Sequence, residues 1–375
     1  MTSIFCSASK LYKRKMASYR FRCAYYNARR FLKDNPQPDI SSVEKDEIDN
    51  YWHSFGIHFK DYSWFQMYYG VTGMHNPRFI PDPLAGYILY PYYNDQTMIA
   101  GWDDKNLYQE LISSVHFPRA LGHCVRGRLY DSTWNYYDKN TDLTRLSDKI
   151  FQRLDGNELI IKATRSTAAG KGVKKLIVKS AADIKNYLLS NNLENFVIQE
   201  KVEQHPFFSQ FNESSVNIIR IVSWRHNGTI KTFPACIRYG IKGSCTDVTF
   251  QKGKEIVNVV GLTEDGEINN RFATLDGLST NECMINIKTC PSYKQMIESV
   301  INAHSHIIPF EVIGWDFTID RNCMPICVEY NIVWPGTVVY QYANGPFAGR
   351  HSDEFLSCLK LPELQKKTRQ YSLLF

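Results

Sequence analysis

Short stretches of alternating apolar and polar residues recur in the second half of the chain, and segments with helical spacing lie between them. Period-two alternation predicts strands, and apolar residues three or four positions apart predict helices. Strands are predicted at Glu158–Thr164, Lys175–Lys179, Phe196–Val202, Asn217–Trp224 and Ile230–Tyr239, and in a hairpin over Ile313–Ile332. Helices are predicted at Asp103–Ser113, Ala181–Asn191 and Tyr293–His304. This mixture of elements predicts an α+β protein.

The N-terminal part of the chain has a different pattern. In residues 10–33, intervals of four and three residues separate Tyr12, Met16, Tyr19, Cys23 and Tyr26, which predicts an amphipathic helix. The segment Asp34–Pro38 ends this pattern, and Ser41 or Ser42 then caps a second predicted helix that runs to about Ser54. Residues 56–98 are rich in aromatics, glycine and proline and give no clear assignment. We therefore expect units at 1–33, 34–98, 99–203 and 204–375.

Composition narrows the class of protein. A chain of 375 residues with 43% hydrophobic and 22% charged residues is typical of a globular protein of two or three domains. Its ten cysteines are scattered and form no Cys-x-x-Cys pair, which predicts reduced thiols. The sequence has no long apolar run and no signal-peptide pattern, so we expect a cytoplasmic location.

Positive charge is concentrated at the start of the chain. Residues 1–33 contain nine Lys or Arg and no Asp or Glu, which leaves 35 basic against 38 acidic residues elsewhere. A nearly neutral body is not typical of a general nucleic-acid-binding protein. Residues 10–33 are expected either to bind an anionic surface, at the inner face of a membrane or on a lipid-linked glycan, or to pack their aromatic side on the body.

The predicted hairpin at Ile313–Ile332 carries a cluster of oxygen-bearing side chains. A turn centred between Asn322 and Cys323 places Asp316 opposite Glu329. One face then carries Gly314, Asp316 and Thr318 against Cys327, Glu329 and Asn331, and the other face is apolar. Directly opposed carboxylates repel each other, and a divalent cation such as Mg²⁺ relieves the repulsion. The alternative is a solvated polar face, which is common in antiparallel sheets.

A second motif combines a lysine with a glycine-containing loop. Lys162 lies in a predicted strand, on the face opposite Leu159 and Ile161, and Gly170 and Gly172 follow it. Glycines let backbone N–H groups approach phosphate oxygens, and a lysine supplies a positive charge. The spacing fits neither a Walker A loop nor a dinucleotide-binding fingerprint. A plain hairpin loop is the alternative.

Taken in order, these motifs resemble the ATP-grasp superfamily over roughly Ile99–Gly349. The matching segments are Asp104-Lys105-Asn106 followed by Phe117-Pro118, Lys162 with its loop, the hinge-like Gln199–Glu203, Asn217–Arg220 with Arg238, and finally Asp316 with Glu329-Tyr330-Asn331. The resemblance implies two α+β subdomains that clasp ATP, here preceded by a helical, aromatic-rich N-terminal region. The segments that look most like a bacterial branch associated with surface-polysaccharide gene sets are Phe79–Pro83, Asp104-Lys105 and Gly314–Asp316.

The resemblance also implies roles for individual residues. Lys105 and Lys162 would hold the α- and β-phosphates, and the loop with Ser166, Gly170 and Gly172 would cover them. Glu200, Lys201 and Val202 match the adenine-binding hinge. The acidic ribose ligand is missing after the hinge, where either Gln204 or His205 would replace it, or His205 is a turn residue.

At the other end of the implied site, metal ligands are expected. Asp316, Glu329 and Asn331 would bind Mg²⁺, as two ions that Mn²⁺ can replace. Arg220 and Arg238 would contact the γ-phosphoryl and acyl groups, unless they are surface residues of their strands.

The family's chemistry implies an ATP-dependent ligase that joins a carboxylate to an amine through an acyl-phosphate. The polysaccharide branch points to a uronic acid and an amino acid or amine in capsule biosynthesis. The alternatives are an ATP-grasp kinase that phosphorylates a hydroxyl and a nucleotide-binding scaffold without turnover.

Overall fold

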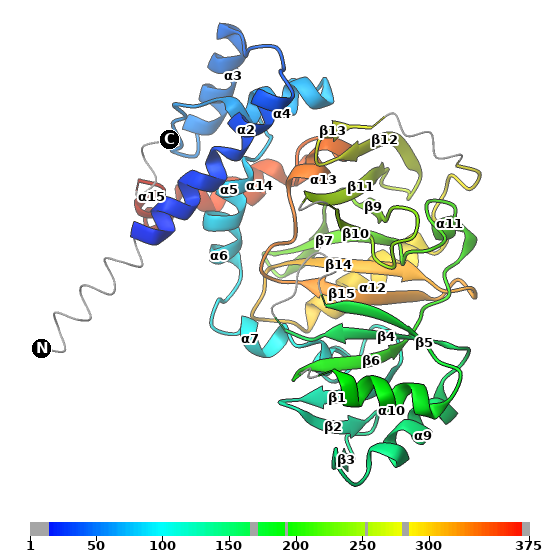
Figure 1. The fold of residues 1–375 in the computed structure, drawn as a ribbon. Coiled ribbons are helices and arrows are strands. Elements are labelled where there is room, and N and C mark those ends of the chain that lie inside the picture. Colours follow the sequence, from blue (N-terminus) through cyan, green and yellow to red (C-terminus); the bar gives the residue numbers. More distant parts are fainter. Residues whose placement is uncertain (1–14, 166–171, 192–193, 252–253, 280–284, 370–375) are drawn as a thin grey trace, which may run out of the picture.

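The structure, a computed structural model, describes residues 15–165, 172–191, 194–251, 254–279 and 285–369. Two antiparallel sheets lie one beyond the other, and helices from both ends of the chain pack together beside the larger sheet (Figure 1). We call these terminal helices, residues 15–93 and 338–369, the helical cap. The predicted α+β class is confirmed.

The smaller sheet has the strand order β3-β2-β1-β6-β4-β5. Its strands are β1 (Ala120–Val125), β2 (Arg128–Asp131), β3 (Tyr136–Tyr137), β4 (Glu158–Ala163), β5 (Val173–Ile177) and β6 (Phe196–Glu200). Helices α9 (Leu143–Arg153) and α10 (Ala181–Ser190) cover one face and enclose an aliphatic core (Figure 1). Leu159 and Ile161 of β4 enter this core, so strand alternation turns Ile160 and Lys162 toward the opposite face.

The larger sheet has nine strands in the order β13-β12-β11-β9-β7-β14-β15, with β10 paired to β11 and β8 to β7. They are β7 (Ile218–His226), β8 (Thr229–Thr232), β9 (Cys236–Tyr239), β10 (Val248–Gln251), β11 (Lys254–Leu262), β12 (Ile268–Thr274), β13 (Gly277–Leu278), β14 (Val312–Ile319) and β15 (Pro325–Asn331). Helix α12 (Tyr293–Ser305) covers one face through Met296, Val300 and Ala303. The short helix α11 (Pro206–Ser209) follows the connection from the smaller sheet.

Two predicted elements are wrong in their extent. The single strand expected at Ile230–Tyr239 is divided into β8 and β9, because Pro234 between them has no N–H for the ladder. The single helix expected at Asp103–Ser113 is a 3-10 turn, η2 (Lys105–Leu107), followed by α8 (Tyr108–Leu111). The backbone N–H of Lys105 donates to the carbonyl of Thr164 (3.2 Å), which ties this turn to the end of β4.

The helical cap accounts for residues that the sequence pattern left unassigned. Its elements are the helical residues 15–25, α2 (Asn27–Asp34), α3 (Ser42–His53), α4 (Ser63–Thr72), α5 (Asp82–Leu84), the π-helix η1 (Ala85–Leu89), α6 (Tyr90–Tyr93), α13 (Val338–Asn344), η3 (Gly349–His351), α14 (Ser352–Leu356), η4 (Ser357–Lys360) and α15 (Pro362–Arg369). Helix α7 (Ile99–Trp102) leads from the cap toward the smaller sheet. Of the two serines predicted as the cap of this helix, Ser41 caps α3, through a capping box with Glu44.

Aromatic side chains form the core of the helical cap. The fully buried rings there include Trp52, Phe65, Tyr68 and Phe79. Phe355, in the C-terminal helix α14, belongs to the same cluster. Hydrogen bonds also join the two ends of the chain, since Gln365 Nε2 donates to the carbonyl of Phe55 (2.7 Å). The helices within residues 338–369 therefore pack on the N-terminal region.

The buried side of the basic N-terminal segment differs from the predicted one. Phe21, Tyr25 and Ala28 are buried in the cap, whereas Tyr19 and Tyr26, predicted on the apolar side, are 57% and 37% exposed. Both sets have helical spacing, but Phe21 and Tyr25 bring two large rings into the core and the Tyr25 hydroxyl donates to the carbonyl of Asp61 (2.9 Å). Tyr12 lies outside the described residues. No helix in the described ranges has the length and apolarity required to cross a membrane.

Candidate active site

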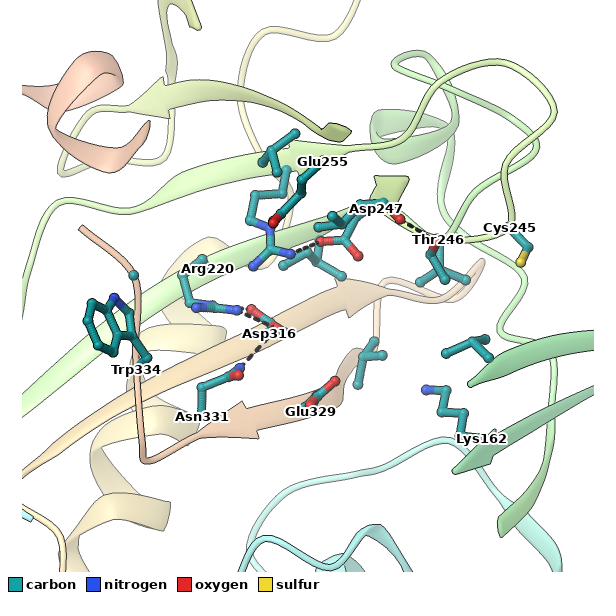
Figure 2. Close-up of a pocket in the computed structure, with 18 of the residues that line it drawn as sticks. Lys162, Arg220, Cys245, Thr246, Asp247, Glu255, Asp316, Glu329, Asn331 and Trp334 are labelled. Carbon is teal, nitrogen blue, oxygen red and sulfur yellow. Dashed lines mark hydrogen bonds and ion pairs between the residues drawn. The ribbon is translucent and has the colours of Figure 1, made fainter. Parts of the chain in front are cut away.

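A cavity of about 500 Å³ lies between the two sheets. This volume is in the range of small-molecule sites. Nine of the predicted site residues line it: Lys105, Lys162, Glu200, Val202, Arg220, Arg238, Asp316, Glu329 and Asn331. Figure 2 shows that the smaller sheet contributes Lys162, whereas the larger sheet contributes Arg220, Asp316 and Glu329.

The hairpin of β14 and β15 has the predicted register where it forms the site. Asp316 pairs with Glu329, and Gly314 pairs with Asn331. A bulge after Asp316 then shifts the pairing by one residue, so that Cys327 lies opposite Phe317. The prediction that Cys327 shares the polar face is therefore wrong, because its side chain is fully buried in the core and Val328 lines the cavity instead.

Arg220, on β7, neutralises one of the two hairpin acids. Its guanidinium makes a bidentate ion pair with Asp316, through Nε to Oδ1 and through Nη2 to Oδ2 at 2.8 Å. Both side chains are largely buried, with 4% and 9% exposed. Asn331 Nδ2 also donates to Asp316 Oδ2 (3.2 Å) (Figure 2). Asp316 and Arg220 face each other across neighbouring strands, so the sheet fixes the pair.

Lys105 neutralises the second acid. Its ammonium lies 3.0 Å from Glu329 Oε1, and only 7% of the lysine side chain is exposed. Lys162 reaches toward the same carboxylate from the smaller sheet (Figure 2). Burial lowers the pKa of Lys162, and the negative charge of Glu329 counteracts this effect. The repulsion expected between the two acids is thus compensated by cations of the chain itself.

The hairpin residues provide a donor set suited to Mg²⁺. Asp316 and Glu329 supply carboxylate oxygens, and Asn331 supplies an amide oxygen. Within the described ranges, no group of three or more His, Cys, Asp or Glu forms a metal cluster. Two carboxylates and an amide still fit Mg²⁺, since this ion keeps several water ligands and is usually held by one or two protein carboxylates together with substrate phosphates.

Arg238 extends the positive wall of the cavity. Its Nη2 lies 2.6 Å from Asp247 Oδ2, and its Nη1 donates to the hydroxyl of Tyr340 (3.5 Å). The Tyr340 ring also lies 5.9 Å from the guanidinium carbon of Arg220. Burial raises the pKa of Asp247, although Arg238 opposes this shift. Tyr340 therefore links two arginines that are both fixed by carboxylates.

The hinge residues are only partly directed toward the cavity. Glu200 and Val202 line it, but the Glu200 carboxylate also pairs with Arg119. The side chain of Lys201 instead pairs with Glu158, at the start of β4.

The remaining predicted ligands lie away from the cavity wall or outside the described residues. His205 Nδ1 accepts a hydrogen bond from the backbone of Phe207 (3.1 Å) and caps α11, which matches the turn-residue alternative. Gln204 Nε2 donates to the carbonyl of Asn217 (2.7 Å). Gly172 precedes β5 with a left-handed φ of +78°. Ser166 and Gly170 lie outside the described residues.

Several cavity residues were not predicted from the sequence. Asp82, Asp247, Trp334, Thr337 and Tyr340 all line the cavity. The run Trp334-Pro335-Gly336-Thr337 begins two residues after the predicted hairpin. Its proline and glycine predict a turn, which was the available signal for a loop beside the ligand-bearing strand. Asp82 and Asp247 meet the cavity only through tertiary packing.

Comparison with known proteins identifies the family. The sugar-transfer associated ATP-grasp family matches residues 87–352. A search of curated proteins found no match.

Among solved structures, the chain is similar to the VanG D-Ala:D-Ser ligase of Enterococcus faecalis, with 13% identity and a TM-score of 0.43, covering 70% of this chain and 61% of that one. It is also similar to D-alanyl-alanine synthetase A of Vibrio cholerae, with 12% identity and a TM-score of 0.41, covering 69% and 64%. The chain thus spans less than two thirds of the length of these proteins. The family match covers more than half of the chain, and the protein belongs to the sugar-transfer associated ATP-grasp family.

Proposed function

We propose that the protein is an ATP-dependent ligase that activates a carboxylate as an acyl-phosphate and transfers the acyl group to an amine. The observation that carries this proposal is the convergence of two lysines, two arginines and the hairpin carboxylates Asp316 and Glu329 on one cavity between the sheets. Phosphoryl transfer depends mainly on positioning and on neutralising charge on the transferred group. A cavity with cations on both walls and oxygen ligands on one wall meets both requirements.

The lysines are proposed to bind the phosphates of ATP. Lys162 comes from the smaller sheet and Lys105 from the turn that precedes it, so the pair can hold a phosphate chain between the sheets. The segment Glu200–Val202 is proposed to contact adenine through its backbone. The loop with Ser166, Gly170 and Gly172 is proposed to cover the phosphates and exclude water that would hydrolyse the acyl-phosphate.

Asp316, Glu329 and Asn331 are proposed to hold two Mg²⁺ ions, which Mn²⁺ can replace. When bound, such ions supply positive charge to the phosphate oxygens. Arg220 and Arg238 are proposed to orient the substrate carboxylate and the acyl-phosphate. Both arginines are held by ion pairs with carboxylates of the cavity wall, so they keep one orientation before the substrate arrives.

The substrates are proposed to belong to surface-polysaccharide or capsule biosynthesis, with a uronic acid as the carboxylate and an amino acid or amine as the nucleophile. The family's association with sugar transfer supports the glycan partner. An assay of ADP release over mixtures of acids and amines tests the proposal. ADP release that requires both partners supports a ligase. Release that requires only a hydroxyl compound indicates a kinase, and ATP binding without release indicates a scaffold.

Replacing Lys162 by Ala is expected to weaken ATP binding by at least tenfold and to leave adenosine binding nearly unchanged. The ammonium contacts phosphate, which adenosine lacks. Isothermal titration with both ligands measures the difference, and Lys174→Ala on the exposed side of β5 is the matched control. An equal loss for both ligands would show that Lys162 acts through the fold.

The basic N-terminal helix is proposed to hold the protein at the cytoplasmic face of an anionic membrane, or to a lipid-linked glycan there. Its buried side is already packed in the cap, and Arg20, Arg30 and Lys33 remain exposed on the other side. Each basic residue near an anionic surface contributes about 1 kcal/mol.

Changing these three residues to Gln is therefore expected to reduce binding to phosphatidylglycerol vesicles by about 10²-fold. Co-sedimentation at low salt measures the effect, with neutral phosphatidylcholine vesicles as the control. If the wild type and the triple variant pelleted equally with the anionic vesicles, the result would contradict the membrane role.

A further inference from the structure

The helical cap contributes part of the cavity wall. Asp82 lines this wall together with Trp334 and Thr337. Asp82 begins α5, before the family match begins at residue 87. This end of the cavity therefore combines a loop of the family's core with a residue from outside it.

The carboxylate of Asp82 has neutral hydrogen-bond partners. The indole Nε1 of Trp334 donates to Asp82 Oδ1 (3.3 Å), and the Thr337 hydroxyl also hydrogen-bonds to the carboxylate. Burial raises the pKa of Asp82 to about 6, although both hydrogen bonds oppose the shift. The titratable groups that face it are the phenols of Tyr68, Tyr87 and Tyr90, and burial raises their pKa values, so they are neutral at physiological pH.

Trp334 is held in place by the same helical segment. A side chain at position 86 would overlap the indole, since a Cβ on Gly86 would lie 1.8 Å from it. Tyr87 and Tyr90 contact the ring edge-on, at centroid distances of 5.8 and 6.3 Å. Gly86 and Tyr87 belong to the π-helix η1, a conformation frequent at functional sites. Trp334 as a whole remains 37% exposed.

We propose that Asp82 and Trp334 form the subsite for the nucleophilic amine and that Asp82 accepts its proton, an inference that rests on the ligase function proposed above. The amine lone pair attacks the carbonyl carbon of the acyl-phosphate and forms the C–N bond. The C–O bond to phosphate breaks, and phosphate leaves with the electron pair. The proton lost from nitrogen passes to an Asp82 carboxylate oxygen.

The chemistry of the wall matches this role. A carboxylate accepts a hydrogen bond from the N–H of a neutral amine, and an indole ring packs against the amine's carbon skeleton. Proton transfer is most efficient when the acceptor titrates near the working pH, and burial brings Asp82 close to that range. Arg220 and Arg238 line the same cavity, so the carboxylate and amine subsites share one space.

The variant Asp82→Asn separates the two half-reactions. Hydroxylamine is largely unprotonated at neutral pH and traps acyl-phosphates as hydroxamates without a protein base. The substrates are the acid and the amine that the ADP-release screen identifies. In the variant, we expect hydroxamate formation from the acid to stay within twofold of the wild-type rate. Amide formation with the amine is expected to fall by about 10²-fold or more. The acidic limb of the wild-type amide pH profile, near pH 6, is expected to disappear in the variant.

Thermal unfolding shows whether the variant folds. Because the folded-state pKa of Asp82 is raised, its contribution to stability is present below about pH 4 and is lost as the pH rises through about 6. Asn lacks this ionisation, so the variant is expected to melt about 2–4 °C above wild type at pH 8 and at a similar temperature at pH 4. Asp46→Asn, on the exposed side of α3, is the matched control and should alter neither measurement.

The outcomes are distinguishable. Equal loss of hydroxamate and amide in the variant, or loss of neither, would overturn the role of Asp82 while leaving the ligase function intact. Failure of the wild-type protein to form hydroxamate from any carboxylate would overturn the ligase function itself, and the role of Asp82 with it.

Discussion

Replacement of Glu329 by Gln is expected to lower the rate of ADP release by about 10³-fold or more. The substitution keeps the shape of the side chain but removes one of two carboxylates in the Mg²⁺ donor set, and amides bind Mg²⁺ more weakly than carboxylates. It also leaves the ammonium of Lys105 without its ion-pair partner at 3.0 Å. Both effects weaken the positioning of the phosphates.

The fold should tolerate Glu329→Gln. Glu329 is 29% exposed, and a Gln amide oxygen can still accept a hydrogen bond from Lys105, so we expect the free energy of unfolding to fall by less than about 2 kcal/mol. A gain in stability from relieved repulsion is not expected, because Lys105 and Arg220 already neutralise the two acids. Urea denaturation and the ADP-release rate are measured on the same sample, with Glu298→Gln on α12 as control. Turnover at the wild-type rate would show that Glu329 is only a polar residue of the cavity wall.

Replacement of Asp316 by Ala is expected to lower the free energy of unfolding by about 3–5 kcal/mol and to abolish turnover. Arg220 is only 4% exposed and would keep a buried positive charge without its bidentate carboxylate. The double variant Arg220→Met with Asp316→Leu removes both charges and fills the space with apolar groups. It should be more stable than Asp316→Ala alone and equally inactive.

Urea denaturation of the wild type and the two variants tests this prediction. A loss below about 1 kcal/mol for Asp316→Ala would mean that water solvates the guanidinium. A double variant no more stable than the single one would mean that packing, and not the unpaired charge, accounts for the loss.

Local pattern was sufficient to predict the residues on the strands. Leu159 and Ile161 mark the core face of β4, so Lys162 follows from alternation alone. The pairing of Asp316 with Glu329 was also predicted, although the pairs beside the turn are shifted by one residue and the bulge restores the predicted register at Asp316. The bulge after Asp316 could not be predicted, because apolar and polar residues alternate without a break along this strand of the sequence. The bulge moves Cys327 into the core.

The sequence pattern could not predict contacts that form only when the chain folds. Arg238 was predicted as a ligand, but its partner Asp247 lies in a loop that only the folded sheet brings near. Asp82 and Trp334 are separated by 252 positions. They meet because the helical cap packs against the loop that follows the β14–β15 hairpin. The buried side of residues 15–25 was missed for a similar reason, because two apolar stripes had the same spacing and the cap selects the one with Phe21 and Tyr25.

The central claim is that ATP activates a carboxylate by phosphorylating it. Labelling both carboxylate oxygens of the acid substrate with heavy oxygen tests this most directly, because an acyl-phosphate retains one of those oxygens in the phosphate that leaves. After complete reaction with ATP and amine, mass spectrometry of the released inorganic phosphate is expected to show one heavy oxygen per molecule. Unlabelled phosphate, or a phosphorylated hydroxyl product, would contradict the account.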